Sequence, residues 1–148
     1  MFHPRSEVVI TAVASRILTR SSSARRQLID ITEDVLEFVR DSHVTNGICV
    51  VSAPHATAAI LANENEGGLV KDILSKIEDL FPKMGKYAHN LIDDNADAHM
   101  AAAFLGHSRI FPVVSHRLAR GTWQNIFLLE LDGPRSRRQV DLQIVGEV

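Results

Sequence analysis

The chain has 148 residues, of which 45% are hydrophobic and 23% charged, and a formal net charge of −2. This length suits a single domain with its own core, and the composition is typical of globular proteins. The small net charge provides no overall basic field for nucleic acid, and no stretch approaches the ~20 apolar residues of a membrane helix. We therefore expect one compact domain over residues 1–148, located in the cytoplasm and associated with neither nucleic acid nor membrane.

The only cysteine, Cys49, lies in the apolar run of residues 47–51. One cysteine cannot form a disulfide within the chain, which agrees with a reducing compartment. Burial among apolar side chains raises the pKa of a thiol and makes it unreactive. Cys49 is therefore expected to be a core residue and not a catalytic nucleophile.

The first half of the chain predicts a strand over residues 7–18, a helix from about residue 30, and strands over residues 48–52 and 57–62. Asp30 or Thr32 is expected to cap this helix, because its side-chain oxygen can accept a hydrogen bond from a first-turn N–H. Ile31, Val35 and Phe38 fall at helical spacing, so one helix face is expected to be buried. This helix should end near Ser42.

The second half begins with the most regular amphipathic pattern of the sequence, over residues 70–81, which Pro82 ends. A further helix is expected from Asp93 or Asp94 to about residue 105, closed by Gly106. Strands are expected over residues 109–114, 122–131 and 139–145, with a turn at residues 132–134. Strands in blocks with about three helices predict an α+β fold of mostly antiparallel sheets.

Three histidines stand where packing does not require them. His55 follows a predicted strand, His89 lies in a stretch without apolar periodicity, and His99 sits on a predicted helix among small residues. Three imidazoles with an open position are a plausible arrangement for a divalent, zinc-like ion. Their spacing matches no standard zinc motif, and each can instead be a general base or a hydrogen-bonded core histidine.

Other polar residues gather near these histidines and at strand ends. Predicted catalytic residues are the carboxylates Glu64, Asp94 and Asp97, and predicted ligand-binding residues are Thr57, Asn63, Asn95, Trp123, Gln124 and Arg135. Asp94 and Asp97 are candidates for a base or for an outer partner of a metal ligand. Trp123 offers a flat surface for an aromatic ring, and Gln124 offers an amide that can hydrogen-bond the edge of that ring. Arg135 offers a guanidinium that can bind a phosphate. The alternatives are a core tryptophan, a solvated turn at Glu64 and a solvated basic edge at Arg135.

Residues 30–147 resemble the YjbQ-like family, also called secondary thiamine-phosphate synthases. The resemblance is carried by the stretches IDITEDVLEFV, PHATAAILANENE, DNADAHM and GTWQNIFLLELDGPRSRR. It implies a small α+β protein that assembles as a homotrimer, with sites near subunit boundaries and metal or anions at the histidine cluster.

The resemblance leaves three functions open. The first is a thiamine-phosphate synthase-like transferase, which joins a pyrimidine pyrophosphate to a thiazole phosphate and releases pyrophosphate. The second is a non-catalytic protein that binds a metal or a small phosphorylated or anionic ligand. The third is a structural interaction module.

Two positions depart from the family pattern. Ala56 replaces the first threonine of the family's His-Thr-Thr-Ala element, so one hydroxyl beside His55 is absent. His116 stands where the family usually has glycine. If that turn requires positive φ, His116 is expected to carry backbone strain.

Overall fold

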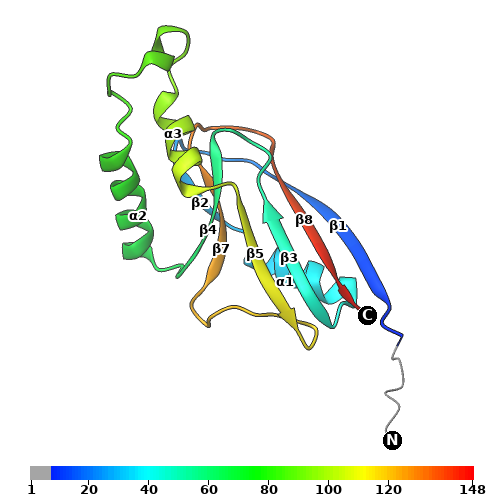
Figure 1. Ribbon diagram of the computed structural model, residues 1–148. Helices are drawn as coiled ribbons and strands as arrows, with labels where there is room; N and C mark the ends of the chain where they lie inside the picture. The colour runs from blue at the N-terminus through cyan, green and yellow to red at the C-terminus, as the bar shows by residue number, and fades with distance from the viewer. Residues whose placement is uncertain (1–7) are drawn as a thin grey trace, which may run out of the picture.

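The structure, a computed structural model, describes residues 8–148 as two antiparallel sheets with three α-helices (Figure 1). The five-stranded sheet has the order β1-β8-β3-β5-β6 and the three-stranded sheet the order β2-β7-β4. The strands are β1 (Thr11–Arg20), β2 (Gln27–Asp30), β3 (Asn46–Ser52), β4 (Ala58–Asn63), β5 (Ser108–Val114), β6 (Arg117–Leu118), β7 (Asn125–Glu130) and β8 (Arg138–Glu147). This confirms the predicted α+β fold with antiparallel pairing.

The helices fall close to the predicted ranges: α1 (Thr32–Ser42), α2 (Gly67–Leu80) and α3 (Ala96–Leu105), with a short 3-10 turn η1 (Ala88–Leu91). The predicted cap of α1 is wrong: Ile31 stands at the N-cap position and no side chain caps the helix, although the Asp30 Oδ1 accepts the N–H of Thr32, the first helical residue, at 2.9 Å. The predicted cap of α3 is wrong. Neither Asp93 nor Asp94 caps it; the helix follows Asn95, and the Asn90 Oδ1 accepts the Ala96 N–H at 3.2 Å.

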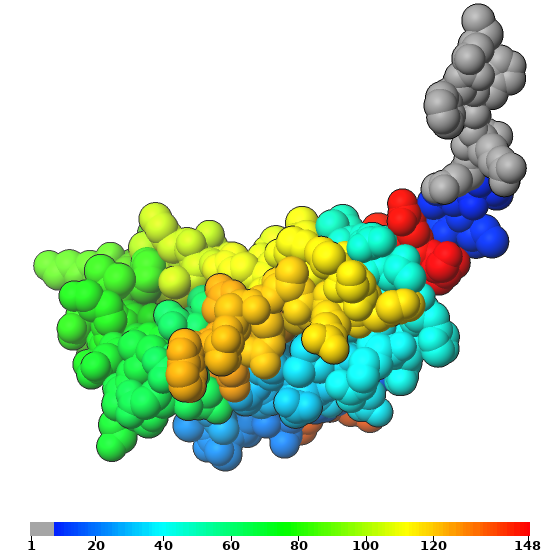
Figure 2. Space-filling view, turned by 90° about the horizontal axis from the view of Figure 1, so that it is seen from below, coloured from blue at the N-terminus to red at the C-terminus, as the bar shows by residue number. Residues whose placement is uncertain are grey.

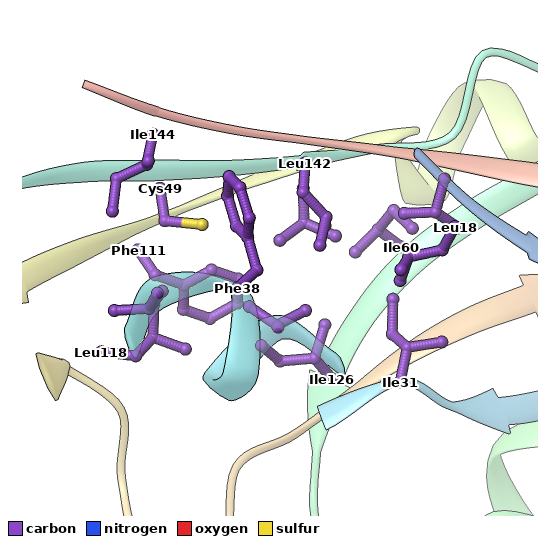
Figure 3. Close-up of a cluster of buried hydrophobic side chains, with 14 of the residues drawn as sticks. Leu18, Ile31, Phe38, Cys49, Ile60, Phe111, Leu118, Ile126, Leu142 and Ile144 are labelled. Atoms are coloured by element: carbon purple, nitrogen blue, oxygen red, sulfur yellow. The ribbon is translucent and has the colours of Figure 1, made fainter. Parts of the chain in front are cut away.

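The main core lies between the five-stranded sheet on one side and α1 with the three-stranded sheet on the other (Figure 3). Ile31, just before α1, and Phe38 of α1 belong to this core together with Ile126 of β7 and Leu142 of β8. Cys49 is fully buried in this core, and burial raises the pKa of its thiol to about 12. The prediction of an unreactive core cysteine is therefore confirmed.

A second core lies on the other face of the three-stranded sheet, under α2 and α3. The buried side of α3 consists of small residues, with Ala98 and Ala101 fully buried. Small side chains let the helix approach the sheet closely, and α3 packs against β4. This contact sets the position of His99 relative to the start of β4 and the loop that precedes it.

The outer face of the five-stranded sheet is left uncovered within one chain. Register pairs Val13 with Val145, Val145 with Ile48, and Ile48 with Pro112, so an apolar row crosses four strands. Val13 is 63% exposed and Ile48 is 42% exposed. No helix within residues 8–148 is long and apolar enough to cross a membrane.

Candidate functional site

A hollow of about 300 Å³ lies where the loop before β4 meets α3, lined by His55, Ala56, His99, Ala102, Ala103 and His107. The strand β3 ends at Ser52 and delivers His55, while α3 delivers His99. His107 follows Gly106, which ends α3. His107 was not among the predicted site residues, although it directly follows the glycine that ends the helix carrying His99, which is a signal readable in the sequence.

His55 is held as a neutral hydrogen-bond donor. Its Nε2 accepts the backbone N–H of Gln139 at 2.8 Å, and an amide nitrogen can only donate. A neutral imidazole has one acceptor nitrogen, so the ring proton resides on Nδ1. Burial, followed by the charge of Arg138, lowers the pKa of His55, which favours this neutral form. His55 therefore offers an N–H through Nδ1 and not a metal-ligating lone pair.

His89 has the opposite arrangement. The Asn95 Nδ2 donates to the Asp132 Oδ2 at 2.8 Å, which turns the Asn95 Oδ1 toward the His89 Nε2 at 3.1 Å. The His89 Nε2 must then carry the proton and donate to Asn95, which leaves the Nδ1 lone pair free. Such orientation of a ring through its second nitrogen is typical of metal-ligating histidines.

His99 connects these two histidines. Its ring lies 4.9 Å from the His89 ring, centroid to centroid, at 69° in an edge-to-face arrangement. The same residue lines the hollow together with His55. The structure thus brings the predicted histidines to one region, through His99 as the shared member. Among residues 8–148, however, no three His, Cys, Asp or Glu side chains are grouped so that they could hold one metal ion.

Asp97 is fixed in a buried ion pair. Its side chain is fully buried, and it accepts hydrogen bonds from Arg25 at 2.7 and 2.9 Å and from Arg26 at 2.7 Å. Burial pushes its pKa up, but the hydrogen bonds and charges of the two arginines outweigh this and lower the pKa. A carboxylate held in this way is a poor base, and its contacts fix α3 to the segment that carries Arg25 and Arg26. Asp94 is exposed in the loop before α3 and does not line the hollow.

Thr57, which follows Ala56 of the hollow, contacts a second buried ion pair, between Arg138 and Glu130. The Arg138 guanidinium donates to the Thr57 Oγ1 at 2.9 Å and is paired with the fully buried carboxylate of Glu130. The Ser22 hydroxyl donates to the same carboxylate at 2.6 Å. The predicted ligand-binding hydroxyl of Thr57 is therefore occupied within the protein.

Arg135 lies at the edge of the histidine region. Its guanidinium donates to the Asp132 Oδ2 at 3.0 Å, and Asp132 is the carboxylate that orients Asn95. The side chain of Arg135 is 52% exposed. Arg135 is thus linked to His89 through Asp132 and Asn95, and it keeps an exposed guanidinium edge.

The remaining predicted ligand residues lie at the opposite end of β4. Asn63 and Gln124 line a separate hollow of about 440 Å³, with Leu61, Ile73, Arg109 and Phe111 among its walls. Trp123 is 71% exposed, so the expectation of a core tryptophan is wrong. Glu64 is half-buried next to Asn63 and lines neither hollow. A six-residue strand separates the two groups by roughly 20 Å.

Fold and site together define a small α+β protein with a histidine-lined surface hollow beside a histidine pair. The sequence profile of the family described as "UPF0047 protein YjbQ-like" matches residues 16–147. The chain belongs to this family, as the residues of the resemblance predicted. The family description does not state an activity.

Relatives and solved structures agree with this assignment. A UPF0047 protein from Methanothermobacter thermautotrophicus is 45% identical over 139 residues, which is 94% of this chain and 96% of the relative. The crystal structure of a protein of unknown function from Sulfolobus solfataricus P2 has a TM-score of 0.92 and 49% identity, and the match covers 93% of this chain and all of that one. A hypothetical protein from Aeropyrum pernix K1 has a TM-score of 0.87 at 42% identity, with 90% and 99% covered.

Proposed function

We propose that the protein binds a small phosphorylated or otherwise anionic ligand in the histidine hollow. The observation that carries this proposal is the donor state of His55, whose Nδ1–H is left free by the bond from Gln139 to its Nε2. All six residues that line the hollow are histidine or alanine, so no carboxylate there opposes an anion. Imidazole N–H groups in a partly desolvated hollow are suitable donors to phosphate oxygens.

A divalent, zinc-like ion is the second part of the proposal, placed at His89 and His99. The Asn95–Asp132 pair supports it, because it orients the His89 ring and leaves Nδ1 as the ligating nitrogen. Imidazole ligands favour ions of the zinc type over Mg²⁺. One chain supplies two of these ligands, which leaves positions for the anion or for a neighbouring subunit. His55 is excluded from this ligand set by its tautomer.

The enzymatic form of the proposal is the thiamine-phosphate synthase-like transfer. At about 300 Å³ the hollow lies at the lower end of the ~300–1,000 Å³ range of small-molecule sites. One phosphorylated group fills such a space, whereas the transfer needs two substrates side by side. Binding of one anion is therefore the better supported function, and turnover requires a wider site than one chain encloses.

The proposed partner is a second and a third copy of this chain, in a homotrimer. The apolar row across the outer face of the five-stranded sheet supports self-association, since soluble monomers rarely expose a contiguous apolar surface of this kind.

Two substitutions separate the anion site from the metal site. His55→Glu keeps an oxygen that accepts the Gln139 N–H and presents no N–H to the hollow, so we expect phosphate affinity to fall about tenfold or more. His89→Gln keeps a donor to Asn95 and removes the Nδ1 lone pair, so we expect loss of Zn²⁺ with phosphate binding largely kept. Calorimetric titration with phosphate and with Zn²⁺ measures both, and thiamine phosphate formation is assayed on the same samples.

The matched controls are His43→Glu and His43→Gln, on an exposed histidine at the end of α1. They should leave both affinities unchanged. Equal phosphate affinity in the His55→Glu and His43→Glu variants would remove the anion proposal. Zn²⁺ binding that survives His89→Gln would remove the metal proposal and leave the anion site standing.

A further inference from the structure

We propose that the hollow at the far end of β4 is a second binding site, which takes a small organic carboxylate with an apolar body. This hollow of about 440 Å³ lies between β4, β5, α2 and the loop before β7, and it shares no lining residue with the histidine hollow. On the face seen in Figure 2, the yellow and orange chain from β5 toward β7 lies beside the green of α2. Its volume falls within the range of small-molecule sites.

The two side-chain amides in this hollow present only donors. The Gln124 Oε1 accepts the Gly121 N–H at 2.7 Å, and the Asn63 Oδ1 accepts the Glu64 N–H at 2.8 Å. Each amide oxygen is thus engaged by the protein's own backbone, which fixes the amide orientation. The Nε2 of Gln124 and the Nδ2 of Asn63 have no hydrogen-bond acceptor among residues 8–148, so a ligand rich in acceptors is favoured.

Arg109 adds a positive charge to the same wall. Its guanidinium donates to the Leu105 carbonyl at 2.6 Å and to the Ser108 carbonyl at 3.1 Å, both neutral groups. Within the described residues it forms no ion pair with a carboxylate. A guanidinium has five N–H donors in a planar fork, so further N–H groups are available to a carboxylate.

The apolar part of the wall determines the body of the ligand. Leu61, Ile73 and Phe111 line the hollow, and the exposed Trp123 directly precedes Gln124 in the chain. Inorganic phosphate would leave this apolar surface in water, whereas an aryl or alkyl carboxylate covers it and places its charge near Arg109. The histidine hollow lacks such an apolar wall, because it is lined by imidazoles and alanine methyls.

Phenylacetate is a suitable probe, with phenylacetamide as its neutral isostere. Trp123 is the only tryptophan of the chain, so its fluorescence reports binding beside Gln124. We expect phenylacetate to bind at millimolar or better affinity, at least tenfold tighter than phenylacetamide. Phosphate at concentrations that fill the histidine hollow should not displace it.

Two isosteric variants test the donor arrangement. Gln124→Glu and Asn63→Asp keep the oxygen that accepts the backbone N–H and replace the free NH₂ by a charged oxygen. Each should weaken phenylacetate binding at least tenfold with little change in thermal stability. Gln27→Glu, on a glutamine of β2 whose Oε1 likewise accepts a backbone N–H, that of Ser23 at 2.9 Å, adds the same charge away from the hollow and should have no effect.

Arg109→Gln tests the charge directly and should weaken phenylacetate binding at least fivefold, with Arg137→Gln on an exposed arginine as its control. If Arg109→Gln loses folded structure, the Gln124→Glu result decides. The proposal is overturned if phenylacetamide binds as tightly as phenylacetate, or if Gln124→Glu and Gln27→Glu bind phenylacetate equally. Either result leaves the phosphate site of the histidine hollow untouched, because that site is measured with different variants.

Discussion

At the scale of single residues, hydrogen-bond partners decide what each histidine can do. His55 and His89 are the same residue type, yet their hydrogen bonds differ. The backbone N–H of Gln139 leaves His55 with an N–H at Nδ1, whereas the Asn95 amide leaves His89 with a lone pair at Nδ1. The backbone conformation of His116 is likewise set by its surroundings, here by the turn in which it lies. It has φ of 65°, and Ser115 before it has φ of 50°, so the turn between β5 and β6 requires the left-handed region. The strain predicted for His116 is therefore present.

His116→Gly is expected to stabilise the protein by roughly 0.5–1 kcal/mol. A side chain in the left-handed region costs about 1–2 kcal/mol, and the greater freedom of glycine in the unfolded chain offsets part of that gain. Urea unfolding measures the change. Lys86→Gly, on an exposed lysine with ordinary φ, should destabilise slightly, and a loss of stability in both variants would refute the strain account.

At the scale of elements, α3 separates two roles on its two faces. Asp97 and His99 are two residues apart, and residues at this spacing do not face each other on a helix. Asp97 therefore points toward Arg25 and Arg26, while His99 lines the hollow. The carboxylate that seemed a catalytic partner of the histidine instead fixes the helix that carries it.

Asp97→Asn should destabilise the protein by about 3–5 kcal/mol at pH 7, because it leaves two arginines without their buried partner. The folded pKa of Asp97 lies below its ordinary value of 3.8. Its contribution is thus complete above that pH and is lost as the pH falls through the lower, folded value. The stability difference from the unsubstituted protein should shrink below pH 4.

Urea unfolding at pH 7 and at pH 3 measures this difference. Asp72→Asn, on an exposed residue of α2, provides the control and should change stability by less than about 0.5 kcal/mol at either pH. A destabilisation of Asp97→Asn that is constant across the two pH values would contradict the ion-pair explanation.

At the scale of the whole molecule, one broad surface has no cover. The five-stranded sheet buries one face against the main core and exposes the other, where apolar residues follow one another across paired strands. A sheet needs only one buried face to fold. The apolar character of the other face is therefore unexplained by the monomer, and the proposed self-association would account for it.

Val13→Lys should shift the protein from trimer toward monomer at micromolar concentration, because it places a charge in the apolar row. Native mass spectrometry and sedimentation velocity measure the assembly. Met84→Lys, at a residue that is 92% exposed outside this sheet, should leave the mass unchanged. A monomeric unsubstituted protein would refute the proposed assembly.

Local pattern was sufficient for the larger elements. The apolar spacing of residues 31–39 and 70–81 and the glycine at position 106 place the helices within a few residues of their observed bounds. β2 and β6 escaped prediction because strands of four and two residues are too short to display alternation. β2 depends on pairing with β7, which is distant in sequence, and β6 depends on pairing with β5 across a two-residue turn.

The sequence by itself determined the family, the fold class, the buried cysteine and the three candidate histidines, because these follow from residue identity and local periodicity. Only the tertiary structure decided that His107 joins His55 and His99, that Asp97 and Thr57 are occupied by arginines, and that Asn63 and Gln124 line a separate hollow. The physical reason is that a side chain's chemistry depends on which groups surround it. Those neighbours come from distant segments, brought together by sheet register and helix packing.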